Sequence, residues 1–288
     1  MSGFSPDWLA LREPADIRAR NADVASALAA RFALRDSVSV VDLGCGTGSN
    51  LRTTSALLPS RQSWTLVDYD SRLLDAARGV LASWADTSTA NDDGSMSLTK
   101  DSRAITVRFR QADLVADLEA MLDPAPDLVT AAALFDLASP EFIRRTARAV
   151  ARTGAVFYTV LTYNGIQHWH PRTPSDGQMT SAFNRHQMTD KGFGVSAGPT
   201  APVHLAEQFE VMGFAVTEGQ SPWIMSAPRD AQLIGELVQG QAAAVRETRA
   251  VDAATVERWL KVARTGAEVG HVDTLAVPPP GGIAGMND

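Results

Sequence analysis

The chain has 288 residues, of which 45% are hydrophobic and 20% charged, ordinary values for a soluble globular protein. Its formal net charge of -7 argues against nucleic acid as the main partner, because phosphate binding needs a basic surface. No stretch approaches the roughly 18 consecutive apolar residues that span a bilayer, so we expect no membrane contact. The N-terminus shows no secretory signal and the single cysteine, Cys45, excludes an intrachain disulfide, so we expect a cytoplasmic protein.

Hydrophobic periodicity predicts helices that alternate with short apolar strands over residues 16–161. Helices are predicted at 16–32, 49–58, 70–84 and 141–151. Strands are predicted at 38–43, 63–68, 105–109, 127–133 and 155–161. Strands that alternate with helices form βαβ units. The sequence therefore predicts a doubly wound α/β fold, with a mostly parallel sheet and helices on both of its faces.

Three stretches interrupt this alternation. Residues 85–103 are polar and small, which predicts a surface loop. Residues 162–200 are rich in Gly, Pro, His, Asn and Gln, and such a long irregular segment is typical of a functional lid. Residues 229–264 predict two amphipathic helices before a last strand at 270–277. The predicted organisation is a single domain over 1–277, with a core at 16–161, a lid or substrate segment at 162–200, a helical insertion at 229–264, and a tail of little structure at 278–288.

A glycine-rich segment, VVDLGCGTGSN, joins the first predicted strand to the next helix. Gly44, Gly46 and Gly48 stand at alternate positions, where a tight turn and close backbone approach to a ligand both favour glycine. The helix that follows offers unpaired N–H groups at its start. Asp68 ends the next strand 20 residues after Gly48, at the position where an acid accepts hydrogen bonds from ribose hydroxyls. Loop and acid together predict nucleoside binding, and the alternative is a structural turn with a solvent-facing aspartate.

The glycine spacing distinguishes between nucleoside ligands. The dinucleotide fingerprint is G-x-G-x-x-G, whereas this loop reads G-x-G-x-G and is preceded by the carboxylate of Asp42. A carboxylate at this place would repel a pyrophosphate, but it suits a ligand that carries an ammonium group and a sulfonium. The loop therefore favours a sulfonium nucleoside over a dinucleotide.

Four segments together resemble class I S-adenosylmethionine-dependent methyltransferases. VVDLGCGTGSN resembles the first motif of that family, and LVDYDSRLLDAA resembles its second strand and following helix. RQADL at 110–114 resembles the motif after the third strand, and APDLVTAAALFDL resembles the fourth strand. The resemblance covers residues 38–161 and implies a seven-stranded Rossmann-like methyltransferase fold that binds S-adenosylmethionine and releases S-adenosylhomocysteine.

The same resemblance implies a role for each matching residue. Gly44, Gly46 and Gly48 would pack against the cofactor, and Asp42 would order its amino-acid end. Asp68 would bind the ribose. Asp113 would accept a hydrogen bond from the adenine amino group while the Leu114 backbone meets the ring, although Asp113 also suits a helix N-cap, and both roles are compatible. The full predicted cofactor set is Asp42, Gly44, Cys45, Gly46, Gly48, Asn50, Asp68, Tyr69, Asp113 and Leu114.

Two histidines that follow the fifth strand are the first candidates for the acceptor side. His168 and His170 flank Trp169 in the segment TYNGIQHWHPR, beyond the carboxyl end of a strand, where ligands bind in open α/β sheets. A histidine with a pKa of ~6.5 can take a proton at neutral pH. Residues i and i+2 of an extended segment point the same way, so a metal pair completed by His186 or Asp190 is an alternative. A third alternative is that the histidines only line a lid.

Asp136, just past the fourth strand, is a further candidate near the transferred methyl, or else caps the helix that begins near Ser139. These features predict in-line methyl transfer to a small-molecule acceptor, in which positioning can supply ~7–11 kcal/mol of the barrier. We expect no metal, and the sequence is compatible with a homodimer. Two other functions stay open at this point, a nicotinamide-dependent oxidoreductase and a nucleoside-binding regulatory protein without chemistry.

Overall fold

The computed structural model describes residues 4–280, so the end of the predicted tail, 281–288, lies outside the described residues. The helices are α1 (Pro6–Ala19), α2 (Ala22–Phe32), α3 (Ser49–Thr54), α4 (Ser71–Trp84), α5 (Leu114–Met121), α6 (Pro140–Thr153), α7 (Asp176–Gln187), α8 (Ala201–Val211), α9 (Ala231–Thr248) and α10 (Ala253–Leu260). The strands are β1 (Ser37–Leu43), β2 (Arg61–Asp68), β3 (Thr87–Ala90), β4 (Met96–Lys100), β5 (Arg103–Gln111), β6 (Leu128–Ala132), β7 (Val156–His170), β8 (Ala215–Gln220), β9 (Trp223–Ser226) and β10 (Gly266–Val277).

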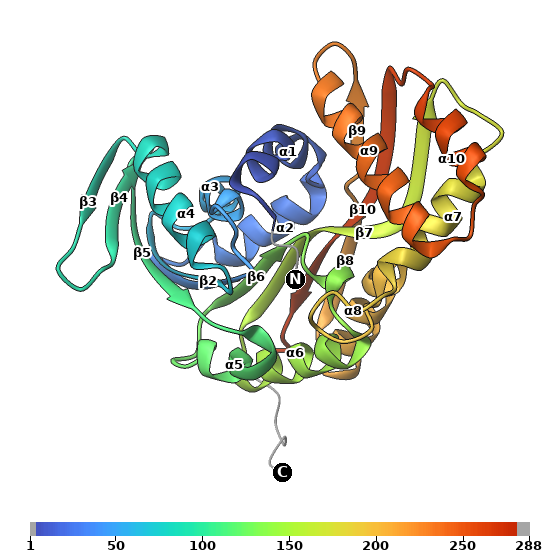
Figure 1. Ribbon diagram of the computed structural model, residues 1–288. Coiled ribbons are helices and arrows are strands. Elements are labelled where there is room, and N and C mark those ends of the chain that lie inside the picture. Colours follow the sequence, from blue (N-terminus) through green and yellow to red (C-terminus); the bar gives the residue numbers. More distant parts are fainter. Residues whose placement is uncertain (1–3, 281–288) are drawn as a thin grey trace.

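All of these strands join one sheet, in the order β3-β4-β5-β2-β1-β6-β7-β10-β8, with β9 paired to β10 (Figure 1). The centre, β5-β2-β1-β6-β7, is parallel, whereas β10 runs antiparallel to both β7 and β8. Setting aside the short strands β3, β4 and β9 leaves seven strands, the number that the resemblance implied. Six of them overlap the strands predicted from the sequence, and β8 was not predicted. The doubly wound, mostly parallel fold is therefore confirmed.

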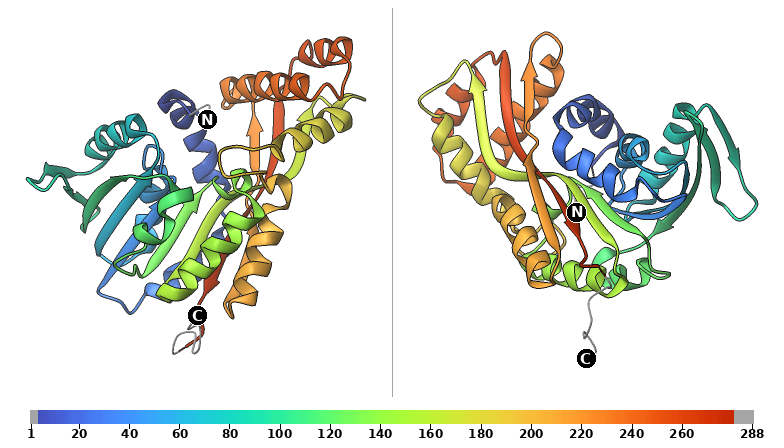
Figure 2. Two further views of the ribbon diagram at one scale, coloured as in Figure 1. Left: turned by 60° about the horizontal axis from the view of Figure 1, so that its bottom comes forward. Right: turned by 180° about the vertical axis from the view of Figure 1, so that it is seen from behind.

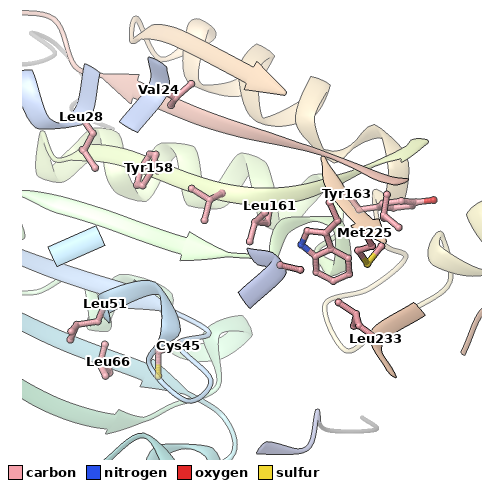
Figure 3. Close-up of a cluster of buried hydrophobic side chains, with 14 of the residues drawn as sticks. Val24, Leu28, Cys45, Leu51, Leu66, Tyr158, Leu161, Tyr163, Met225 and Leu233 are labelled. Carbon is pink, nitrogen blue, oxygen red and sulfur yellow. The ribbon is translucent and has the colours of Figure 1, made fainter. Parts of the chain in front are cut away.

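The sheet is buried on both faces, as its continuous apolar strands predicted. Because successive side chains of a strand point to opposite faces, Val40 of β1 joins one core cluster and Val41 joins the other. The first cluster packs under α2 and α4 and includes Leu28, Leu66 and Leu81, and part of it is shown in Figure 3. The second cluster lies under α5, α6 and α8. Helices thus cover both faces, which leaves the strand ends to form a site.

The predicted helix at 16–32 was wrong in its extent. The structure has two helices there, because the chain turns at Arg20 and Asn21. The Asn21 side chain accepts hydrogen bonds from the amides of Asp23 and Val24 (3.1 and 3.0 Å) and so begins α2. Pro14 lies inside α1. The break lets α1 leave the sheet and reach over the strand ends.

Two predictions of irregular structure were also wrong. Residues 85–103 contain the hairpin of β3 and β4, which adds to the β5 edge through main-chain pairing. Within 162–200, the first nine residues continue β7 and residues 176–187 form α7. The helical insertion at 229–264 is confirmed by α9 and α10.

The extended ends of β7 and β10 carry a projecting lobe, composed of residues 162–187, β9, α9, α10 and residues 266–272. Figures 1 and 2 show this lobe rising beside α1, away from the parallel half of the sheet. The long β7–β10 ladder has register shifts near Gly270 and Asp273. Beneath the second shift, the Asp273 carboxylate accepts the Leu161 and Asn21 amides, each at 2.8 Å. None of the described helices is long and apolar enough to cross a bilayer.

Candidate functional site

A cavity of about 1070 Å³ opens at the carboxyl ends of β1, β2, β5 and β6, bounded by α1 and by the loop after α7. This is the edge at which open α/β sheets bind ligands. Of the ten predicted cofactor residues, eight line the cavity, namely Gly44, Cys45, Gly46, Asn50, Asp68, Tyr69, Asp113 and Leu114. Asp42 and Gly48 are buried and do not line it.

The glycine loop adopts backbone conformations that other residues avoid. Gly44, Gly46 and Gly48 have φ angles of 66°, 55° and 78°. A Cβ atom at Gly44 would lie 3.1 Å from the side chain of Leu134, and one at Gly46 would lie 3.0 Å from that of Leu9. The loop is therefore closed in by its neighbours and presents main chain to the cavity, as the sequence predicted.

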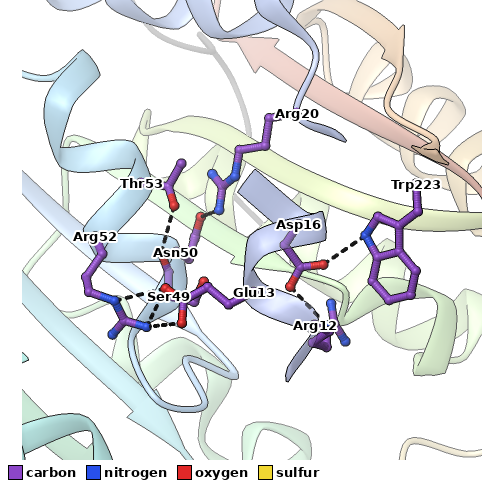
Figure 4. A network of polar contacts seen from close by, with 9 residues as sticks. All are labelled: Arg12, Glu13, Asp16, Arg20, Ser49, Asn50, Arg52, Thr53 and Trp223. Atoms are coloured by element: carbon purple, nitrogen blue, oxygen red, sulfur yellow. Dashed lines mark hydrogen bonds and ion pairs between the residues drawn. The ribbon is translucent and has the colours of Figure 1, made fainter. Parts of the chain in front are cut away.

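Asp42 acts on the cavity through Asn50. The Asp42 side chain is fully buried, and its Oδ1 accepts a hydrogen bond from Asn50 Nδ2 at 2.8 Å. Asn50 Oδ1 in turn accepts from Arg20 at 3.0 Å (Figure 4). Arg20 also donates to Thr54 at 2.9 Å. Burial raises the pKa of Asp42 to about 7, although Asn50 and Arg20 oppose that rise. Arg20 was missed from the sequence, because an arginine off the apolar face of a predicted helix reads as a solvated side chain.

Asp68 holds the glycine loop and still reaches the cavity. Its Oδ2 accepts the Gly46 amide at 2.8 Å and its Oδ1 accepts the Asp70 amide at 3.0 Å. Burial raises the pKa of Asp68, and the two amides oppose that rise. A carboxylate has about four lone-pair sites, so two remain for a ligand. Its neighbour Tyr69 is exposed on the cavity wall.

Asp113 caps α5, since its side chain accepts the Val115 amide at 2.9 Å. The structural alternative for Asp113 is thus confirmed, and because Asp113 and Leu114 also border the cavity, the adenine role stays a prediction. Cys45 lies on the wall as well, and burial raises the pKa of its thiol, so the thiol is neutral.

The structure does not bring the predicted catalytic residues to the cavity wall. His168 and His170 are exposed near the end of β7, opposite Glu268 and Gly266 of β10. Trp169 between them is buried in the projecting lobe instead. No group of three side chains able to hold a metal ion occurs within residues 4–280. The histidines were expected at the acceptor because irregular chain was expected there, whereas a regular strand carries them away from the cofactor residues.

Asp136 does not line the cavity, although Leu134 and Leu137, close to it in the chain, do. Its Oδ1 is buried and has no hydrogen-bond partner within the described chain. Burial raises the pKa of Asp136 to about 6, and the nearby charge of Arg12 opposes the rise. The Asp136 side chain does not cap α6, because Ser139 does so by accepting the Phe142 amide at 3.1 Å.

The helix α1 forms the wall opposite the glycine loop and is held by polar contacts (Figure 4). Its Asp16 accepts from Arg12 at 2.9 Å and from the Trp223 indole at 3.0 Å. Its Glu13 pairs with Arg52 of α3, two groups whose nearest atoms are 2.6 Å apart. Only Ala15 and Asp16 of the helix are buried. Because so little of α1 is apolar and buried, no periodic pattern in the sequence indicated that this helix borders a site.

No protein-family model matches the sequence, and no curated protein matches it significantly. Solved structures do match in fold. A cyclopropane-fatty-acyl-phospholipid synthase-like protein from Lactobacillus casei has a TM-score of 0.53 at 15% identity, covering 95% of this chain and 94% of that chain. The cyclopropane synthase MmaA2 from Mycobacterium tuberculosis has a TM-score of 0.51 at 13% identity, again covering 95% and 94%.

A third structure, the YcgJ protein from Bacillus subtilis, has a TM-score of 0.51 at 13% identity and covers 89% of this chain and 99% of that chain. At such low sequence identities a structural similarity supports a conclusion about the fold alone. It extends over nearly the whole of each chain, beyond the residues 38–161 on which the sequence resemblance rested. The chain therefore has the Rossmann-like fold of class I S-adenosylmethionine-dependent methyltransferases.

Proposed function

We propose that this protein transfers a methyl group from S-adenosylmethionine to a small-molecule acceptor. The observation that carries the proposal is one cavity that joins the glycine loop, Asp68, Asp113 and Arg20. In this reading Asp68 accepts from the ribose hydroxyls, and Asp113 with the Leu114 backbone receives the adenine. Neither the glycine spacing nor the carboxylates suit a pyrophosphate, so the proposal favours this cofactor over a dinucleotide.

The residues at the amino-acid end of the cofactor fit a zwitterion. Among the described residues no carboxylate lies within 4.0 Å of the Arg20 guanidinium, whose partners are the neutral Asn50 and Thr54. An arginine on a cavity wall that makes no direct ion pair suits the carboxylate of a ligand. In this reading the chain that joins this carboxylate to the nucleoside runs along Gly44 and Gly46, which line the same cavity.

The main catalytic contribution of the protein is to position the methyl acceptor against the cofactor. The bound cofactor supplies an electrophilic methyl group on a sulfonium. Leu134, Leu137 and Leu161 line the cavity beyond the glycine loop, and such apolar walls exclude water from the reacting atoms. Of the predicted catalytic residues, Asp136 stays a candidate proton acceptor, because it lies between Leu134 and Leu137 in the chain and its buried Oδ1 has no partner within residues 4–280.

Replacing Arg20 with methionine tests the orientation of the cofactor. We expect R20M to bind S-adenosylhomocysteine roughly 10- to 100-fold more weakly, since a hydrogen bond to a charged group is worth ~1.5–3 kcal/mol. Binding of 5′-methylthioadenosine, which lacks the amino-acid carboxylate, should not change. The matched variant D68A should weaken both ligands, because both contain the ribose. Calorimetry in which R20M weakens both ligands equally would contradict this orientation.

Transfer itself is tested with S-adenosylmethionine labelled in its methyl group and an extract of small molecules. Wild-type protein should move label into a small-molecule fraction, and D68A should move much less. Tight cofactor binding without transfer to any fraction would favour a nucleoside-binding regulatory protein instead.

A further inference from the structure

The acceptor side of the cavity combines apolar and polar side chains. Its apolar part includes Phe4 and Leu9 near the N-terminus, Leu134 and Leu137 after β6, Leu161 of β7, and Phe193 after α7. Walls of this kind take up the hydrophobic body of a ligand, and a few polar groups then fix its orientation. The cationic side chains on the wall therefore carry information about the ligand.

Among the described residues, four cationic side chains line this cavity, namely Arg12, Arg20, Arg72 and Lys191. Arg12 pairs with Asp16 at 2.9 Å and Arg72 pairs with Asp70 at 2.7 Å. Within residues 4–280, no carboxylate lies within 4.0 Å of Arg20 or of Lys191. We have assigned Arg20 to the carboxylate of the cofactor, which leaves Lys191 as a second cation in the same cavity that has no directly paired carboxylate among residues 4–280.

His186 and Glu247 hold the Lys191 side chain in place. Lys191 Nζ lies 3.3 Å from His186 Nδ1, and His186 Nε2 lies 2.9 Å from Glu247 Oε2. An ammonium group can only donate, so His186 Nδ1 accepts and the ring proton resides on Nε2, which donates to Glu247. The Glu247 side chain is 71% exposed, and therefore its charge is well solvated. Lys191 keeps two further N–H groups for a ligand.

Partial burial lowers the pKa of Lys191, and the more distant charge of Glu247 opposes that change. The charged form of a lysine that is partly desolvated and makes no direct ion pair is stabilised by an anion placed beside it. Asp190, next to it in the chain, does not supply that anion, because its Oδ1 accepts the Gly192 amide at 2.7 Å and its carboxylate is farther than 4.0 Å from Lys191.

We propose that Lys191, held by His186, binds an anionic group of the methyl acceptor, so that the substrate is a small acid with an apolar body and a carboxylate or phosphate. This inference rests on the proposed methyltransferase function, since it assigns Arg20 to the cofactor and the apolar wall to the acceptor. The two anions then occupy different cations of one cavity, the cofactor at Arg20 and the acceptor at Lys191.

The probes for the test are phenylacetate, phenyl phosphate and the neutral phenylacetamide, titrated calorimetrically with and without S-adenosylhomocysteine. We expect at least one acid to bind wild-type protein better than the amide does. In K191M its affinity should fall roughly tenfold to a hundredfold, as expected for a lost charged hydrogen bond, whereas K191R should keep most of it. K261M, which removes an exposed lysine at the end of α10, should behave as wild type. The two acids separate a carboxylate site from a phosphate site.

Equal binding of the acids by wild type and K191M would overturn the proposal, and so would failure of both acids to bind at millimolar concentration. An unchanged melting temperature and unchanged S-adenosylhomocysteine affinity of K191M show that the variant is folded. The two proposals fail in different ways, because loss of the cofactor assignment appears as no binding of S-adenosylhomocysteine to wild-type protein.

Discussion

Replacing Arg264 with methionine is expected to destabilise the protein by about 3 kcal/mol, since removing one partner of a buried ion pair typically costs ~3–5 kcal/mol. The Arg264 side chain is only 1% exposed and pairs with Asp176 at 2.8 Å. Its guanidinium also lies 5.0 Å from the centre of the Trp259 ring and 5.8 Å from that of Trp169. We expect the lower end of the range, because Asp176 is 16% exposed and keeps hydrogen bonds from Thr173 and Trp259.

Denaturant unfolding of R264M measures this loss, and R246M is the matched control. Arg246 pairs with Glu257 at 2.5 Å, but both side chains are about half exposed, so this pair is worth about 0–1 kcal/mol. Burial would raise the pKa of Asp176, but its hydrogen bonds and Arg264 lower it overall, so the stability from this pair is lost as pH falls below the unfolded value of 3.8. Equal losses for R264M and R246M would show that the buried pair does not hold the projecting lobe.

Replacing Asp42 with asparagine is expected to remove a large, pH-dependent destabilisation of the folded protein. Burial raises the Asp42 pKa from 3.8 to about 7 in the folded protein, a difference equivalent to roughly 4 kcal/mol. Between these values the folded chain holds a proton that the unfolded chain has lost, so rising pH favours unfolding. The free energy of unfolding of wild type should therefore fall relative to that of D42N from pH 4 upward and level off above about pH 7.

Denaturant unfolding at a series of pH values measures this difference. D136N is the comparison variant, because burial raises the Asp136 pKa only to about 6. The difference in the free energy of unfolding between wild type and D136N should therefore level off at a lower pH than that for D42N. The amide oxygen introduced by D42N can still accept from Asn50, so this variant should fold. A wild-type minus D42N difference that stays constant with pH would show that Asp42 is ionised in the folded protein over the whole range.

The cofactor half of the site could be predicted because its determinants are local. Three glycines between a strand and a helix specify a loop of positive φ angles, as observed. The βαβ unit then fixes where the next strand ends, so the position of Asp68 followed from counting residues. Asp42 was predicted at the cofactor, but it lies one layer behind Asn50, since spacing does not reveal which polar side chain faces outward.

The acceptor half depends on contacts between residues far apart in the sequence. β7 continues to His170 because β10, about a hundred residues later, pairs with it, although the segment TYNGIQHWH reads as loop by itself. The hairpin β3–β4 likewise owes its strands to pairing with β5. The proposed role of Lys191 becomes apparent only in the folded structure, where it lines the same cavity as Arg20. Periodicity carries no information on such pairings.

The most direct test of the account is a calorimetric titration of wild-type protein with S-adenosylhomocysteine, NAD and NADP. The account predicts micromolar binding of S-adenosylhomocysteine, with a raised melting temperature because a ligand selective for the native state stabilises it, and no binding of the two dinucleotides. Binding of NAD or NADP without any response to S-adenosylhomocysteine would contradict it.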